Sequence, residues 1–429
     1  DGQTRGEARG IPSVCSAHPV VLKAAFERAL EDGSSVLVEA TSNQVNPEGG
    51  YSGMTPGAFA SFVGGLADEA SLPRDRVILG GDHLGPHPWR ARPAAVAMAC
   101  AAETVRQYVG AGCAKVHLDA SMACADDPAG LLAEEVAAAR TAELAAAAEA
   151  ALGERPPGAP PPLYVVGTEV PSPGGQAGPH GGPVPTCADD AERTLALTRA
   201  AFARLGVERA FERVVAVVVQ PGVEFGDDVV FRYPGGRADL SAVAARHGLV
   251  FEAHSTDYQD EGALRALVRD RFAILKVGPE LTFALRASLF ALEAIERELL
   301  SRTKVRLSGL RQALDRAMRG DPRHWREFYR DADAGARGLK RAFSLSDRCR
   351  YYWPVPAVRE ARERLLGNLG GRRVPRGLLE QHFPDTEGVL AGDEPDLPAR
   401  LERLRVRRVL DRYARACRRA PVSNGPRFP

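Results

Sequence analysis

The stretch Val77-Ile78-Leu79-Gly80-Gly81-Asp82-His83-Leu84-Gly85-Pro86 decides the fold. Its short apolar run is typical of a buried parallel strand, and the run ends in an Asp-His pair followed by glycine and proline. An imidazole can hold a metal ion, and a carboxylate beside it can move a proton. Taken alone, the pair is more simply explained as a strand and a turn, with His83 in the core or at its rim. The recurrence of this pattern along the chain favours a functional interpretation.

Eight short apolar segments of this kind occur, and most of them are followed by a helix-like stretch. This alternation predicts a parallel sheet, and a count of eight favours a closed (β/α)8 barrel of the TIM type. A doubly wound open sheet is the alternative, but no strand is followed by a Gly-x-Gly-x-x-Gly turn. The predicted strands lie at 10–16, 35–41, 77–86, 114–120, 163–169, 214–220, 249–254 and 273–277.

The chain of 429 residues is longer than the roughly 250–300 residues at which a single hydrophobic core stops growing. We expect residues 1–302 to form the barrel and to carry the site. Residues 303–429 have helical patterns broken by prolines and no strand-like run. They are predicted to form a C-terminal helical extension packed on the barrel.

The composition excludes several classes of protein. A net charge of +1 gives no electrostatic reason to expect nucleic acid or a membrane surface as a partner. No apolar run approaches the ~20 residues of a membrane helix, and the chain does not start with a signal-peptide pattern. The 7 cysteines are scattered without a Cys-x-x-Cys spacing. We therefore expect reduced cysteines in a cytoplasmic protein.

Polar residues close the predicted strands with unusual regularity. They are Glu39, Asp82, His83, Asp119, Ser121, Glu169, Gln220, Glu252, His254 and Lys276. The carboxyl ends of barrel strands meet at one mouth, so these side chains are expected to converge there. His83 and His254 could anchor Zn²⁺ or a similar divalent ion, with Glu169, Gln220 or water completing its ligands. Each residue alone has a structural explanation, such as a helix cap or an ion pair.

Glycine-rich turns follow several of these strands. Pro173-Gly174-Gly175-Gln176 and Gln220-Pro221-Gly222-Val223 expose backbone N–H groups, and Ser255-Thr256 opens a helix. Such turns and helix N-termini suit a phosphate or a polyol. The candidate substrate-binding residues at the strand ends and turns are Glu39, Gly174, Gly175, Gly222, Ser255 and Lys276. A P-loop kinase is not supported, because the sequence lacks a Gly-x-x-x-x-Gly-Lys-Ser/Thr motif.

A series of motifs resembles the GatZ/KbaZ-like family, the Z subunits of class II D-tagatose-1,6-bisphosphate aldolase. The motifs are Gly-Gly-Asp-His-Leu-Gly-Pro (80–86), Val-His-Leu-Asp-Ala-Ser-Met (116–122), Gly-Thr-Glu-Val-Pro-Ser-Pro-Gly-Gly (167–175), Val-Gln-Pro-Gly-Val-Glu-Phe-Gly (219–226), Phe-Glu-Ala-His-Ser-Thr-Asp-Tyr-Gln (251–259), Leu-Lys-Val-Gly-Pro-Glu-Leu-Thr-Phe-Ala (275–284) and Ser-Asp-Arg-Cys-Arg-Tyr-Tyr-Trp-Pro (346–354). The resemblance covers nearly the whole chain. It implies a partner that activates and stabilises a catalytic class II aldolase chain.

The family is in turn similar to the class II aldolases themselves. That similarity implies that Asp82 is the proton-transfer acid/base and that His83 and His254 are zinc ligands. It also implies that Asp119 and Glu169 are acidic residues near the metal. Those aldolases have a third zinc histidine on the sixth strand, where this chain has Gln220. An amide binds zinc more weakly than an imidazole, so the site is expected to be looser, differently occupied or empty.

Three functions follow from these observations. The first is an aldolase subunit that supports a catalytic chain. The second is a metal-dependent enzyme that breaks the C3–C4 bond of a ketose, as an aldolase, or re-forms it at the other face, as a C4-epimerase. The third, tagatose-6-phosphate kinase, is an older label for some relatives and has the least support. The expected partners are a ketose or ketose phosphate and a class II aldolase chain, and a homo-oligomer is also open.

Overall fold

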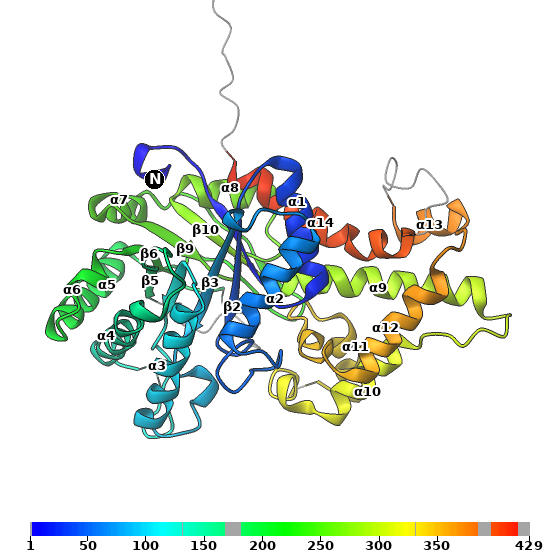
Figure 1. Ribbon diagram of the computed structural model, residues 1–429, viewed down its shortest axis with the longest axis horizontal. Helices are drawn as coiled ribbons and strands as arrows, with labels where there is room; N and C mark the ends of the chain where they lie inside the picture. Colours follow the sequence, from blue (N-terminus) through cyan, green and yellow to red (C-terminus); the bar gives the residue numbers. More distant parts are fainter. Residues whose placement is uncertain (1, 131, 168–181, 331, 385–395, 419–429) are drawn as a thin grey trace, which may run out of the picture.

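A closed parallel barrel forms the body of the protein. The computed structural model describes residues 2–130, 132–167, 182–330, 332–384 and 396–418. Within these residues, the barrel strands follow one another in the order β1-β10-β9-β6-β5-β4-β3-β2. The prediction of a (β/α)8 barrel with C-terminal helices is confirmed (Figure 1). The barrel strands are β1 (Ile11–Cys15), β2 (Val36–Thr41), β3 (Val77–Leu84), β4 (Lys115–Leu118), β5 (Leu163–Gly167), β6 (Val214–Val218), β9 (Val250–Ala253) and β10 (Phe272–Val277).

Helices surround the barrel and continue beyond it. Around the barrel lie α1 (Pro19–Asp32), α2 (Pro56–Glu69), α3 (Ala94–Gly110), α4 (Glu134–Ala150), α5 (Ala188–Arg204), α6 (Glu208–Phe211), α7 (Ala238–His247), α8 (Glu261–Arg269) and α9 (Pro279–Leu300). The later helices are α10 (Leu310–Gly320), α11 (Ala334–Phe343), α12 (Pro356–Leu369), α13 (Arg376–His382) and α14 (Leu397–Cys417). Short 3-10 helices are η1 (Gln3–Arg5), η2 (Arg74–Arg76), η3 (His87–Trp89), η4 (Leu152–Glu154), η5 (Pro322–His324) and η6 (Arg348–Tyr352). The hairpin of β7 (Glu224–Phe225) and β8 (Val230–Phe231) was not predicted.

Two adjacent glycines in β3 permit dense packing on both faces of the strand. A Cβ on Gly80 would meet Glu39 Oε1 at 2.6 Å, and a Cβ on Gly81 would meet Tyr108 of α3 at 2.7 Å. Successive strand residues point to opposite faces, so Gly80 faces the barrel interior and Gly81 faces the helices. The missing side chain at Gly80 therefore leaves room for a carboxylate inside the barrel.

The barrel interior is layered by chemistry. A small apolar cluster fills the end nearer the amino ends of the strands, and it consists of Leu37, Val165, Ala216, Val218 and Ile274. Two residues further along β2 and β10 come Glu39 and Lys276, which point to the same face because side chains alternate along a strand. Apolar packing thus closes one end of the barrel, and charged groups occupy the next layer.

The C-terminal helices form an extension beside the barrel. Helix α9 runs from the barrel into this extension, and α10 to α13 lie along it (Figure 1). Helix α14 then returns along α9 and packs against α1 and α8. The backbone N–H of Gly10, just before β1, donates to the carbonyl of Cys417 at 3.0 Å. None of the described helices is long and apolar enough to cross a bilayer.

Candidate active site

A local irregularity in β3 places Asp82 and His83 in the site. The pairing of β3 with β4 shifts register between Gly81 and Leu84, and His83 has a φ of 47°. This left-handed conformation costs a non-glycine residue roughly 1 kcal/mol or more. In a regular strand the two side chains would point to opposite faces. Here Asp82 and His83 both line the same cleft.

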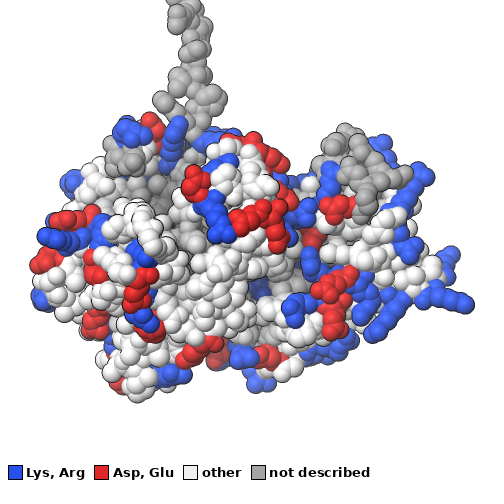
Figure 2. Space-filling view, in the orientation of Figure 1, with Lys and Arg blue, Asp and Glu red and all other residues white. Residues whose placement is uncertain are grey.

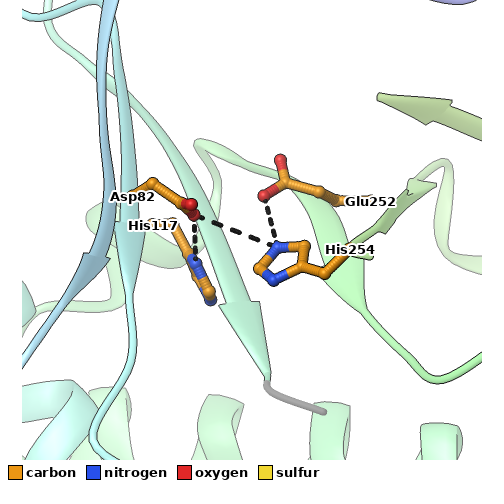
Figure 3. Close-up of side chains that lie close together, drawn as sticks. All are labelled: Asp82, His117, Glu252 and His254. Atoms are coloured by element: carbon orange, nitrogen blue, oxygen red, sulfur yellow. Dashed lines mark hydrogen bonds and ion pairs between the residues drawn. The ribbon is translucent and has the colours of Figure 1, made fainter. Parts of the chain in front are cut away.

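Four buried side chains from three strand ends form a compact cluster (Figure 3). Asp82, His117, Glu252 and His254 each offer one ligand atom, and these atoms lie within 4.8 Å of one another. Asp82 Oδ1 is 3.1 Å from His117 Nδ1 and 3.9 Å from His254 Nε2. Glu252 Oε1 is 2.9 Å from the same His254 nitrogen. Two imidazoles and two carboxylates are a donor set that suits a divalent ion.

The surroundings of His117 orient one of its ring nitrogens toward Asp82. Its Nε2 lies 2.9 Å from the carbonyl oxygen of Gly167, which can only accept, so Nε2 carries a proton. Its Nδ1 lies 3.1 Å from Asp82 Oδ1 and 3.3 Å from the backbone nitrogen of His83. The contact between Nδ1 and Asp82 requires either a proton on Nδ1, which donates to the carboxylate, or a cation between the two atoms.

A layer of ion pairs lies beneath the cluster. Lys115 Nζ is 2.7 Å from Glu39 and 2.6 Å from Glu252, and Lys276 Nζ is 3.1 Å from Asp82 and also pairs with Glu39. Burial opposes ionisation of Asp82, but Lys276 and the histidines outweigh it and hold its pKa well below the usual range. The layer and the cluster together thus contain three buried carboxylates and two buried ammonium groups.

His83 and Asp119 form a second pair at the edge of the cluster. His83 Nδ1 lies 2.7 Å from Asp119 Oδ2, and its ring centroid lies 4.6 Å from that of His254. Burial lowers the pKa of His83, but Asp82 and Asp119 outweigh this effect and raise it. Burial and the neighbouring His83 lower the pKa of His254 to about 4, so His254 is neutral at physiological pH. The rings of the two predicted histidines thus lie side by side, although His83 is not one of the four residues whose ligand atoms converge.

A cleft with a volume of about 1780 Å³ opens above these residues. One wall comes from the barrel and includes His83, His254 and Ser255. The opposite wall comes from the extension and includes Arg350 and Tyr351 of η6. The Ser255 hydroxyl is buried and has no hydrogen-bond partner among the described residues, so it is available to a ligand. The cleft is large enough for a sugar phosphate and is built by both parts of the chain.

Not all of the predicted residues line this cleft. Gln220 is buried, and its amide oxygen accepts the backbone N–H groups of Gly222 at 2.8 Å and Val223 at 3.0 Å. That oxygen therefore stabilises a turn, and neither Gln220 nor Gly222 lines the cleft. Glu39 is fully buried among Ser13, Lys115 and Lys276. It therefore lies below the cleft surface, whereas a substrate-binding residue would lie at that surface. Lys276 does line the cleft.

Three predicted residues, Glu169, Gly174 and Gly175, lie outside the described residues. Conversely, His117 and Glu252 belong to the cluster although the sequence analysis gave them no role as ligands. The sequence did contain a signal for both residues, namely their place in the alternation of side chains along a strand. Residues two apart on a strand share a face, so His117 shares the inward face with Lys115, and Glu252 shares it with His254. His117 thus supplies the cluster with an imidazole that was not predicted as a ligand.

The chain is a (β/α)8-barrel protein with a buried cluster at its mouth that could hold a metal ion. Comparison of the sequence with known families identifies the class of protein more specifically. The sequence model of the family described as D-tagatose-1,6-bisphosphate aldolase subunit GatZ/KbaZ-like matches residues 1–418, and the chain belongs to this family.

Named relatives and a solved structure agree with this membership. The D-tagatose-1,6-bisphosphate aldolase subunit GatZ of Salmonella heidelberg (strain SL476) is 49% identical over 391 residues, which cover 90% of this chain and 91% of the relative. The GatZ subunit of Klebsiella pneumoniae is 49% identical over 383 residues, or 88% of each chain. A crystal structure from Sinorhizobium meliloti 1021, described as a probable tagatose 6 phosphate kinase, is 45% identical with a TM-score of 0.85. That match covers 95% of this chain and 100% of the other.

Proposed function

We propose that this chain is the GatZ-type subunit of a D-tagatose-1,6-bisphosphate aldolase in ketohexose metabolism. In that role it supports the activity and stability of a catalytic class II aldolase chain. The observation that carries the proposal is its similarity to GatZ subunits, at 49% identity over 90% of its length. The extension that accompanies the barrel gives the chain surface beyond the site that a partner can use. We also propose that residues 1–302 and 303–429 are its two structural parts.

The test is to mix this chain with the class II tagatose-bisphosphate aldolase chain of its own organism. We expect a complex by analytical ultracentrifugation, together with a higher aldolase rate or a longer half-life of the catalytic chain at elevated temperature. Serum albumin at equal mass serves as the control for nonspecific protection. Absence of a complex and of any effect on rate or lifetime would contradict the proposal.

A second candidate is metal-dependent ketose chemistry at the chain's own site, and the buried cluster favours it. Asp82, His117, Glu252 and His254 would hold a divalent ion, with Zn²⁺ favoured by the imidazoles and with His83 as the adjoining ligand predicted from the sequence. Such an ion supplies a Lewis acid that polarises the ketose carbonyl. A phosphoryl-transfer role has no support of this kind, because the sequence lacks a phosphate-binding loop.

In this second role the protein side chains bind the sugar and move one proton. Asp82 Oδ1 faces His117 and His254, whereas Oδ2 faces Cys15 at 3.8 Å and His83 at 3.9 Å on the cleft side. Asp82 would take the proton from the C4 hydroxyl as the C3–C4 bond breaks. Asp119 would hold the orientation of His83 through its bond to Nδ1. Ser255 and Lys276 would contact sugar hydroxyls, and Glu169, Gly174 and Gly175 remain predicted members of the site.

The metal site can be tested without turnover. Purified protein equilibrated with zinc and passed through a desalting column is expected to retain about one ion per chain. Replacing His117 or His254 by alanine is expected to weaken zinc affinity at least ~10-fold, because each removes an imidazole from the cluster. Gln220→Ala is the matched control and should retain zinc, since its oxygen is bound to backbone N–H groups.

Mass spectrometric metal analysis measures the retained ion, and circular dichroism checks that each variant is folded. Retention of zinc by both histidine variants would contradict the assignment of the cluster. Loss of zinc from a folded Gln220→Ala protein would restore Gln220 as a ligand.

A further inference from the structure

Helix α11 exposes apolar side chains and buries a charged one. Leu339 and Phe343, one turn apart, are 63% and 49% exposed, whereas Arg341 is the buried residue of this helix. An amphipathic surface helix normally shows the reverse arrangement. Adjacent exposed apolar side chains on a soluble protein commonly mark a surface that another molecule covers.

A groove lies beside this helix, between α9, α10 and α11. Its volume is about 400 Å³. Its lining is mixed: Phe290, Leu314 and Met318 are apolar, whereas Glu293, Arg297, Arg311, Asp315, Arg319 and Arg341 are charged. The ring of Phe343 meets that of Phe290 edge-on, with centroids 6.1 Å apart. Aromatic and methionine side chains are enriched in the cores of protein interfaces, and methionine adapts readily to a partner's shape. The exposed side chains of Leu339 and Phe343 and the adjoining groove are together called the α11 face.

Cations border the α11 face on the side of α9 and α10. The guanidinium of Arg311 lies 5.0 Å from the ring centre of Phe290 and 5.4 Å from that of Phe343. The loop between α9 and α10, residues 301–309, is strongly basic. Residues 301–309 include Arg302, Lys304 and Arg306 and no acidic residue, and all three cations are exposed. Figure 2 shows Lys and Arg gathered at this end of the molecule.

These cations are not neutralised within the chain. In the described part of the structure, Arg302, Lys304 and Arg306 form no ion pair with a carboxylate. The whole chain has a net charge of only +1, so the excess is local. A partner complementary to this area presents an apolar side chain flanked by carboxylates.

The α11 face is also connected to the cleft. Lys340 of α11 bonds Asp227 at 2.7 Å, which ties the helix to the β7–β8 hairpin of the barrel part. The chain then continues directly into η6, whose Arg350 and Tyr351 line the cleft. Between them, the Leu345 carbonyl accepts a bond from Tyr258 at 2.7 Å. A partner that contacts α11 would therefore touch a helix that leads directly into one wall of the cleft.

We propose that the α11 face, together with the basic loop 301–309 at the outer end of the extension (Figure 1), is the surface through which this chain binds the catalytic class II aldolase chain. The inference rests on the proposed function, because that function supplies the partner. The partner inserts an apolar side chain against Leu339 and Phe343, and its carboxylates face Arg302, Lys304, Arg306 and Arg311. A second copy of this chain and nucleic acid are the occupants that the test distinguishes.

The test measures the affinity of the full-length chain for the aldolase chain of its own organism by isothermal titration calorimetry. Leu339→Ser and the pair Leu339→Ser/Phe343→Ser are each expected to weaken binding at least 10-fold. Leu205→Ser is the control, since Leu205 is an exposed leucine (49%) that follows α5 on the barrel, and this variant should bind as the unaltered chain does. The single Leu339 change touches no packed core, so the test does not depend on whether Phe343 tolerates replacement.

Charge reversal tests the basic loop separately. The triple variant Arg302→Glu/Lys304→Glu/Arg306→Glu is expected to bind at least 10-fold more weakly at low salt. Affinity of the unaltered chain should fall between 50 mM and 300 mM salt more steeply than that of the triple variant. Unfolding temperatures of all variants are measured alongside, and those of Leu339→Ser and the triple variant should match the unaltered chain.

Each outcome decides between the occupants. Equal binding by the unaltered chain and all variants would overturn this proposal and leave the subunit role intact. If the unaltered chain does not bind the aldolase chain, the proposed function itself fails. Self-association that Leu339→Ser abolishes assigns the face to a second copy, and binding of a duplex DNA or RNA probe lost in the triple variant assigns it to nucleic acid. Either result would overturn the proposal.

Discussion

Replacing Lys276 by methionine is expected to destabilise the protein by about 3–5 kcal/mol at neutral pH, because it leaves buried carboxylates without their cation. The ammonium group of Lys276 contacts Asp82 at 3.1 Å and also pairs with Glu39, and all three side chains are buried. Methionine fills a similar volume without a charge. Urea denaturation followed by circular dichroism measures the change in the free energy of unfolding.

The loss should depend on pH in a defined direction. Lys276 helps to hold the pKa of Asp82 below its unfolded value. A depressed carboxyl pKa contributes stability that is present above the unfolded value of ~3.9 and is lost as pH falls through the folded pKa. Without Lys276 this contribution is smaller, so the difference between the two proteins should be largest near pH 7 and should shrink in acid. A difference that does not change with pH would contradict the electrostatic explanation.

Two further variants separate charge from packing. The pair Glu39→Gln/Lys276→Met removes one carboxylate together with its cation and should recover part of the lost stability. Lys23→Met breaks the exposed pair with Glu69, whose side chains are 39% and 62% exposed, and should cost no more than about 1 kcal/mol. An equal loss in all of these variants would mean that lysine packing, rather than charge, carries the effect.

Replacing Asp82 by asparagine is expected to reduce ketose turnover by about 10²–10⁴-fold if the chain is itself an enzyme. Asparagine keeps the size of the side chain, but it cannot take a proton from the C4 hydroxyl. The measurement is a panel of ketohexoses and ketose phosphates, including tagatose 1,6-bisphosphate, run with zinc-loaded protein. Loss of turnover with zinc retained assigns Asp82 to proton transfer, and loss of both assigns it to metal binding.

Turnover of the sugar panel is measured first with the unaltered chain. If zinc-loaded protein alone turns over no member of the panel, the enzyme interpretation is excluded for those sugars and the subunit role stands alone. If Asp82→Asn retains full turnover, the proposed part of Asp82 in proton transfer is wrong. Asp119→Asn should have a smaller effect, of about 10-fold, because Asp119 contacts His83 rather than the cluster.

The barrel and much of its mouth could be predicted from the sequence because two simple periodicities determine them. Apolar runs that alternate with helices define the parallel sheet, and the last residues of those runs define its mouth. Asp82 and His254 were found in this way, and both belong to the buried cluster. His117 was missed because it lies within a strand, where a histidine is commonly a core residue.

Other features depend on contacts that a single strand does not reveal. The sequence does not show that the oxygen of Gln220 is bound by its own turn, or that Glu39 is enclosed by Lys115 and Lys276. Those arrangements follow from barrel closure, which brings β2, β4 and β10 to a common interior. The extension wall of the cleft is likewise set by long-range packing, since η6 lies far from β3 in sequence.

The contacts of helix α14 determine how the protein would respond to truncation. It belongs to the C-terminal part of the chain, yet Asp411 pairs with Arg28 of α1 and Tyr413 bonds the carbonyl of Thr256 at 2.7 Å. Helix α14 thus connects the C-terminal part of the described chain to α1 and to the loop after β9, across the outside of the barrel. A circular permutant opened in the loop at 301–309 would keep these contacts. A chain truncated at residue 302 would lose them and would expose the sides of α1 and α9 that α14 covers.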